Sequence, residues 1–452
     1  HSRSRWIVIA LAMAGATQWF SPSTANALAS YARQTGLACS ACHWAFPELT
    51  PTGRDFKLGA YTQSAEDKNI TEEGNLRAAG LSVLDDVPLS VALQTSITAT
   101  DKAQPSSQFA SVEFPQAINF WLAGKITPNF GTLVQLTYAA SSNALGGDSS
   151  DIRFAAAKTE LAGSSLVWGI DANNNPTVED LWNTTPAFGF PFVNPDSAGF
   201  GPEARTIIDG PLATNVIGGG PYFMWADHLY GLVELYRSQH LGIPQPDTGA
   251  PTPPAVTQIN INDVAPYWRV AWQQSIDKNN YIEVGTYGIY VSSFPNAVSG
   301  PTDSYLDLAG DLSYELTLPS GDMIILHGTY IHEVTDLSAS VTLSAASQAS
   351  DSLDTARVDL SYHFGNIAIF SAGGFVTWGT SDVLRYAAGF ANGDPGNSGL
   401  LGQVAVWPWQ NFEIGVQYRA FLTFNGAATN YDGGGRNASD NNTFYIFIWM
   451  DF

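Results

Sequence analysis

The chain has few charged side chains and no long uninterrupted apolar run. Charged residues make up 13% of its 452 residues, about half of the roughly 25% that is usual in soluble domains. Beyond the N-terminal region, no stretch reaches the roughly 18 consecutive apolar residues of a membrane-spanning helix. Hydrophobic residues nevertheless make up 45% of the chain and aromatic residues 12%. Apolar residues distributed in this way indicate alternating β-strands, which in a membrane form a barrel.

Basic residues are scarce as well. The chain has 19 Lys and Arg residues against 41 Asp and Glu, and its formal net charge is −22. This balance argues against a nucleic-acid partner, which would require basic patches. The negative charge favours cationic partners, although it is also explained by solubility alone.

The first 27 residues predict a signal peptide. Arg3 and Arg5 form a short basic region, residues 6–16 form an apolar run, and small residues at 25–27 supply a cleavage site. The apolar run is too short for a membrane anchor. We therefore expect the mature protein to be exported.

Only two cysteines are present, and both fall in the sequence CSACH at positions 39–43. This is the attachment motif of a c-type haem. Its spacing allows the Cys39 and Cys42 thiols to add to the two vinyl groups of one haem. The adjacent His43 imidazole then takes an axial position on the iron. The motif therefore predicts one covalent haem.

Three alternatives apply to the same motif. A disulfide between the two cysteines is possible in an oxidising compartment. A zinc site would need two more ligands, and residues 31–61 contain no other Cys or His. A thioredoxin-like site would require a βαβ context, which is absent.

The second axial ligand of such a haem has no candidate nearby, because residues 28–80 contain no Met and no second His. The iron is then either five-coordinate or takes a ligand from the barrel. Four residues lie on the face predicted to line the lumen, close to predicted short turns. They are His327, which we favour, Met323 on the same strand, His228 and His363.

From about residue 86 onward, segments with a period of two residues alternate with turn signals. Residues 306–318 are the clearest, with Leu306 and Leu308 on one face and Asp307 and Asp311 on the other. We count sixteen such segments. Short turns alternate with longer loops, and the last segment ends in Phe452. These features predict an all-β fold, an antiparallel transmembrane barrel of about 16 strands; a soluble β-sandwich array explains neither of them.

The predicted organisation is therefore a signal peptide over 1–27, a mono-haem cytochrome c-like domain over 28–80 and an outer-membrane, porin-like barrel over 81–452. With an even strand count, both chain ends and the short turns are periplasmic and the long loops extracellular. A barrel of this size leaves an aqueous channel. We expect the small domain to sit inside the periplasmic half of that channel.

Charged residues gather on the face predicted to line the lumen. An acidic lumen would concentrate cations, and a hydrated, ion-paired pore wall explains the pattern equally well. The acidic residues are Glu234, Glu283, Asp307, Asp311, Glu315, Asp359 and Glu413, partly balanced by Arg269, Arg357 and Arg419.

Two segments carry a family resemblance. Residues 32–43 read ARQTGLACSACH and residues 46–58 read FPELTPTGRDFKL. In the barrel, residues 175–186 read NPTVEDLWNTTP and are followed by GFP at 189–191. The chain thereby resembles the fused monohaem c-type cytochrome–porins, outer-membrane iron oxidases of iron-oxidising bacteria. The family usually has an aromatic residue where Thr52 stands.

The resemblance implies an extracellular iron(II):cytochrome c oxidoreductase in the outer-membrane lipid. Fe(II) is the electron donor, the covalent haem receives one electron, and a periplasmic c-type cytochrome is the acceptor. Two other functions are compatible with the same sequence. One is a porin whose haem domain plugs or gates the channel. The other is a haem conduit for a different donor, such as copper or an organic reductant.

Overall fold

The computed structural model describes residues 28–65, 69–70, 81–82, 88–103, 107–195, 204–239, 259–295, 297–386, 390 and 392–452. The predicted signal peptide lies outside these residues. None of the helices in the described ranges is long and apolar enough to cross a membrane.

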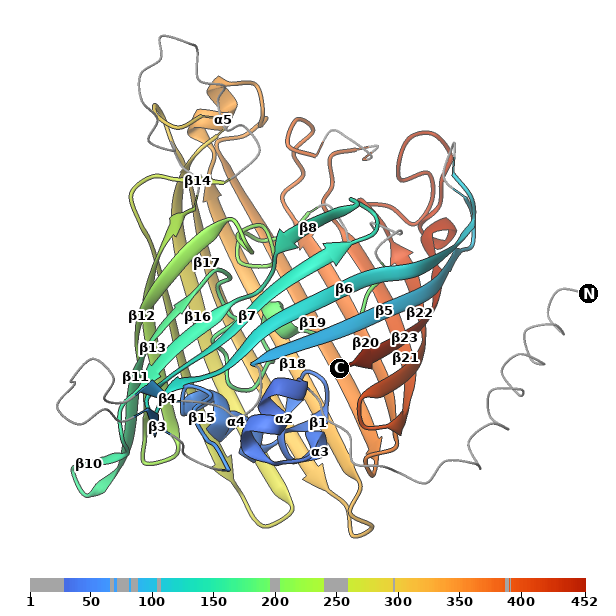
Figure 1. Cartoon of the computed structure of the whole chain (residues 1–452). Helices are drawn as coiled ribbons and strands as arrows, with labels where there is room; N and C mark the ends of the chain where they lie inside the picture. Colours follow the sequence, from blue (N-terminus) through green and yellow to red (C-terminus); the bar gives the residue numbers. More distant parts are fainter. Residues whose placement is uncertain are drawn as a thin grey trace, which may run out of the picture.

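Sixteen strands, of which one, β9 (Asp151–Ala155), is short, form one closed antiparallel barrel (Figure 1). Strands that follow each other in the chain are paired, and closure occurs where β23 (Thr443–Asp451) pairs with β5 (Leu89–Thr100). On the other side of β5, the short β9 (Asp151–Ala155) pairs with both β7 (Phe130–Ala139) and β11 (Ser164–Asn173). No edge of the sheet is therefore left open, and the predicted sixteen-stranded barrel is confirmed.

The remaining barrel strands follow in chain order. They are β6 (Ala110–Thr127), β12 (Val216–Trp225), β13 (Leu229–Ser238), β15 (Ala265–Ser275), β16 (Asn280–Phe294), β17 (Asp303–Thr317), β18 (Met323–Asp336), β19 (Ser350–Phe364), β20 (Ala368–Gly379), β21 (Asn397–Trp409) and β22 (Phe412–Thr423). Short strands extend the loops and turns: β8 (Ala144–Gly147), β10 (Thr159–Leu161) and β14 (Asn260–Ile261).

The alternation that predicts the barrel also decides which side chains face outward. On β17, Leu306 and Leu308 are 39% and 46% exposed, whereas Asp307 between them is fully buried. The same inside–outside alternation recurs around the barrel, and the exposed side is rich in Leu, Val, Ile and aromatic residues. Such an apolar outer face on a closed barrel requires lipid around it. The protein is an outer-membrane β-barrel.

The two ends of the barrel differ. Short turns at 128–129, 226–228 and 365–367 lie at one end, and long loops, including 174–215, begin at the other. The N-terminal helices lie at the end with the short turns, at the bottom of Figure 1. In outer-membrane barrels the short turns are periplasmic and the long loops extracellular.

The N-terminal segment (residues 28–65) lies inside the barrel at the short-turn end. It consists of α2 (Ala29–Thr35), α3 (Cys39–Cys42), β1 (His43–Ala45), β2 (Glu48–Leu49) and α4 (Pro51–Leu58). Arg54 of this segment forms an ion pair with Glu315 of the barrel wall. The Tyr222 hydroxyl of β12 donates to the Leu58 carbonyl at 2.8 Å. These contacts with lumen-facing residues confirm the predicted position in the lumen. Outside this segment, β3 (Asn69–Ile70) pairs with β4 (Leu81–Ser82).

Candidate cofactor site

The two cysteines and His43 line one cavity, of about 100 Å³, between the N-terminal segment and the barrel. Most of its walls are apolar, as is usual for cofactor pockets. The N-terminal segment contributes Leu37, Leu49 and Phe56, among others, and the barrel wall contributes Trp121 and Leu133. The three residues of the predicted attachment motif thus share one apolar enclosure.

The chemical state of these three residues suits a covalent haem. No disulfide joins Cys39 and Cys42 in the structure. Burial raises the pKa of the Cys42 thiol. Burial also lowers the pKa of the His43 imidazole from 6.5 to about 4. His43 is therefore neutral at physiological pH, which is the form that binds a metal.

Local packing explains how this motif is held. The Thr50 hydroxyl donates to the Ala41 carbonyl at 2.6 Å, and the Thr50 backbone N–H donates to the Cys42 carbonyl at 3.0 Å. The same hydroxyl accepts from the Gly53 N–H and so caps α4. A Cβ at Gly53 would lie 2.2 Å from the Cys42 carbonyl oxygen. Glycine is therefore required at this position for α4 to pack against the motif.

Two buried cations of α4 fix the N-terminal segment in the lumen. Arg54 pairs with Glu315, as described above. The Lys57 ammonium donates to the Val178 carbonyl at 2.7 Å and to the Asn183 side-chain oxygen at 3.2 Å. Asn183 in turn donates to the Pro47 carbonyl at 2.7 Å. Burial lowers the pKa of Lys57 from 10.5 to about 8. The segment is thus attached both to the wall and to the long loop after β11.

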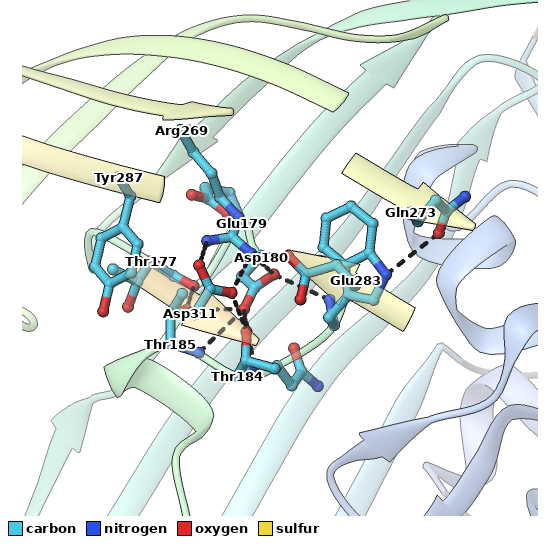
Figure 2. Close-up of polar contacts among 12 residues, drawn as sticks. Thr177, Glu179, Asp180, Thr184, Thr185, Arg269, Gln273, Glu283, Tyr287 and Asp311 are labelled. Carbon is cyan, nitrogen blue, oxygen red and sulfur yellow. Dashed lines mark hydrogen bonds and ion pairs between the residues drawn. The ribbon is translucent and has the colours of Figure 1, made fainter. Parts of the chain in front are cut away.

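That loop folds into the lumen around a buried arginine (Figure 2). Arg269 of β15 lies 3.0 Å from the Asp180 carboxylate, 2.8 Å from Asp311 and 3.3 Å from Glu283. None of these four side chains is exposed to solvent. Asp180 also accepts backbone N–H groups of residues 182, 184 and 185, which shapes the turn of the loop. We call residues 174–195 the inner loop.

The acidic residues predicted to face the lumen are buried in the structure. All seven acidic residues have exposed fractions of 9% or less. Of the predicted balancing cations, Arg269 contacts three carboxylates, Arg357 pairs with Asp209, and Arg419 donates to the Asn194 side chain. Sequence reasoning missed Arg153, which is fully buried between Asp151 and Asp171. The same alternation along β9 would have placed Arg153 on the lumen face.

The four residues predicted as a second axial ligand have other neighbours. His327 lies 3.6 Å from Asp359, and His363 lies 3.1 Å from Glu48. The Met323 sulfur accepts from Thr317, and His228 is exposed in the turn after β12. None of the four lines the cysteine cavity, whose described walls contain one His, His43, and no Met. Their ligand role stays a prediction.

A second, polar cavity adjoins the first. This vestibule measures about 710 Å³, and its walls include Gln94, Thr137, Asp148 and Thr443. Thr443 begins β23 and Asp148 precedes β9, so the vestibule reaches the end of the barrel that carries the long loops. The two cavities share some of their wall residues. These are Phe46, Pro47, Trp121, Gln135, Ser149 and Phe188.

Comparisons with known proteins give the following similarities. No protein-family profile and no curated protein matches the chain. Salmonella typhi OmpF, solved in complex with daunomycin, is 10% identical with a TM-score of 0.49 and covers 82% of this chain and 98% of its own. Vibrio cholerae OmpT, expressed in the outer membrane, is 9% identical with a TM-score of 0.42 and covers 80% and 97%. A mutant of the Rh. blastica porin is 10% identical with a TM-score of 0.37 and covers 80% and 99%.

Proposed function

We propose that this protein is an outer-membrane electron-transfer protein that oxidises extracellular Fe(II). The electron would leave through a covalent c-type haem at Cys39, Cys42 and His43 for a periplasmic c-type cytochrome. One observation carries the proposal: the attachment residues line an apolar cavity that shares a wall with a vestibule reaching the loop end. An external donor can therefore approach the cofactor site without crossing the membrane.

The residues of the chain have distinct parts in this reaction. Cys39 and Cys42 would hold the haem covalently through their thiols. His43, held neutral by burial, would offer a nitrogen lone pair to the iron. The apolar side chains around them exclude water, and Arg54 anchors the segment to the wall. A c-type haem, when bound, supplies one-electron chemistry by cycling between ferric and ferrous iron.

The vestibule offers polar groups to a small hydrated cation. Its walls combine apolar residues with neutral polar side chains, among them Gln94, Asn119 and Gln135, and they also carry one carboxylate, Asp148, and two guanidinium groups, Arg205 and Arg419. The net charge of −22 attracts cations to the protein as a whole. Each Fe(II) that gives up one electron there becomes Fe(III) on the outer side. The insoluble ferric product is thus kept out of the periplasm.

A gated porin is the second candidate, and the size of the vestibule favours it. In that function the N-terminal segment would close the lumen at the short-turn end and open on reduction. The inner loop, fixed by Arg269 and its three carboxylates, narrows the middle of the same lumen. Both functions place the N-terminal segment in the lumen. They differ in whether Fe(II) donates electrons to the haem, so a test of the electron donor distinguishes them.

Stopped-flow spectroscopy tests the proposal. Oxidised protein in detergent or liposomes is mixed with Fe(II), and the haem absorption bands are followed. We expect reduction by Fe(II) and no spectral change with Zn(II), which has the same charge but no redox chemistry. Prompt reduction by dithionite together with none by Fe(II) would overturn the iron-oxidase proposal and favour the gated porin.

A further inference from the structure

A group of ligand-type side chains lies where β2 of the N-terminal segment meets the barrel wall. Glu48 of β2, His327 of β18 and Asp359 of β19 each place one ligand atom within 4.8 Å of the others. His327 and Asp359 are direct cross-strand partners, so the pleat holds them side by side. Glu48 approaches them from the lumen. All three side chains are buried.

The carboxylates in this group are incompletely satisfied. Glu48 Oε2 and Asp359 Oδ2 are buried and accept no hydrogen bond of good geometry, although His363 Nε2 lies 3.1 Å from Glu48 Oε2. The nearest nitrogen to Asp359 Oδ2 is His327 Nδ1 at 3.6 Å, beyond hydrogen-bond distance. Buried carboxylates without donors are costly unless they are paired or coordinate a metal. The two oxygens thus point to a ligand between them.

A further set of contacts orients Glu48. The Ser361 hydroxyl donates to Glu48 Oε1 at 3.0 Å, and His363 Nε2 lies 3.1 Å from Glu48 Oε2. Supporting groups of this kind hold metal ligands in place in known metal sites. Access is also available, because Asp359 lines a separate lumen cavity of about 230 Å³. Arg357 in that cavity is paired with Asp209.

We propose that Glu48, His327 and Asp359 bind one divalent transition-metal ion that clamps the N-terminal segment to the barrel wall. One imidazole and two carboxylates suit Fe(II), Mn(II), Zn(II) or Co(II). The ion replaces the missing donors of both carboxylates and joins β2 to β18 and β19. The site is independent of the proposed electron transfer, because none of its residues lines the cysteine cavity.

Co(II) is the probe that tests this site, because its visible absorption reports coordination. Full-length protein in detergent is treated with a chelator and titrated with Co(II), and bound cobalt is counted by elemental analysis. We expect one Co(II) per chain. His327→Ala and Asp359→Asn should each weaken binding by more than about 100-fold. His363→Ala, which removes a supporting group, should weaken it by about 10- to 100-fold.

His332→Ala is the matched control. His332 and Asp354 form a similar His–carboxylate pair at 2.7 Å on the same two strands, but His332 is 39% exposed. Cobalt binding should be unchanged in this variant. The haem spectrum and the heat-modified gel mobility of each variant show that it is folded and loaded.

Two results would overturn the proposal. One is the absence of saturable Co(II) binding by the wild-type protein. The other is equal cobalt affinity in the wild-type, His327→Ala and Asp359→Asn proteins. Fe(II)-driven haem reduction is measured separately, so failure of the metal site and failure of the iron-oxidase proposal are distinguishable. Loss of a low-spin haem spectrum in His327→Ala would instead assign His327 to the haem iron.

Discussion

The two sides of the lumen are built from different chemistry. On the side of β9–β17, buried charges fill the space, with Arg153 and Arg269 each enclosed by carboxylates. On the side of β5–β7, β22 and β23, the wall carries mostly neutral polar side chains and faces the vestibule. We call these the closed side and the open side. The cysteine cavity lies below the vestibule, where the N-terminal segment meets the open side.

The difference follows from what each side must contact. Charges can be buried only when they are paired, and pairing fixes their partners in position. On the closed side this holds the inner loop against the wall. Neutral amides and hydroxyls are satisfied by water as well as by protein groups. The open side can therefore stay hydrated, and it offers the route along which a solute reaches the cofactor site.

The largest expected effect is the loss of haem attachment when a cysteine is replaced where the open side meets the N-terminal segment. Cys39→Ala or Cys42→Ala should abolish stable two-bond haem attachment, because these are the only two cysteines in the chain. Haem staining of a denaturing gel measures this, and Ser40→Ala is the matched control. Full staining in both cysteine variants would refute the covalent assignment.

Deletion of residues 28 to 75 should open the vestibule toward the short-turn end of the barrel. The inner loop remains fixed by Arg269 and its carboxylates, so the new opening lies along the open side. Single-channel conductance in planar bilayers should rise severalfold over that of the full chain. Unchanged conductance would mean that the N-terminal segment does not obstruct the pore.

Arg269→Leu should destabilise the closed side of the lumen. The variant leaves Asp180, Glu283 and Asp311 buried together without a counter-charge. Breaking a buried ion pair from one side costs about 3–5 kcal/mol. The free energy of unfolding in urea, followed by tryptophan fluorescence, should fall by an amount of this order. Lys158→Ala removes the exposed pair with Asp227 at the short-turn end. That control should change the same quantity by less than about 1 kcal/mol.

The smallest expected effect is that of Gln94→Glu on the rate of haem reduction by Fe(II). Gln94 lines the vestibule on β5, and a carboxylate there raises the local concentration of Fe(II). The second-order rate constant of haem reduction by Fe(II) should rise a few-fold at low ionic strength, with Gln94→Lys moving it in the opposite direction. The difference should vanish at high salt. Equal rates for both variants would exclude the vestibule as the route.

The sequence predicted the barrel well because its signals are local. Strands with a period of two residues and turn residues between them are visible in any window, and they located sixteen strands and the buried Asp307 beside the exposed Leu306. The haem motif is equally local. What could not be predicted depends on contacts between distant residues. The alternation of side chains along the strand placed His327 on the lumen face. No local pattern shows that Glu48, far away in the chain, lies next to it there. The folding of the inner loop into the lumen, set by Asp180 and Arg269, was missed for the same reason.

An external donor is expected to reach the cofactor site along the open side. Ser149 lines both the vestibule and the cysteine cavity. A Ser149→Cys variant, labelled with a bulky maleimide after haem attachment, blocks the passage between them. The labelled control is Ser320→Cys, at an exposed turn. In stopped-flow mixing with Fe(II), haem reduction should slow by about 10-fold or more in labelled Ser149→Cys and stay at the wild-type rate in labelled Ser320→Cys. Equal, wild-type rates in both labelled proteins would contradict the account.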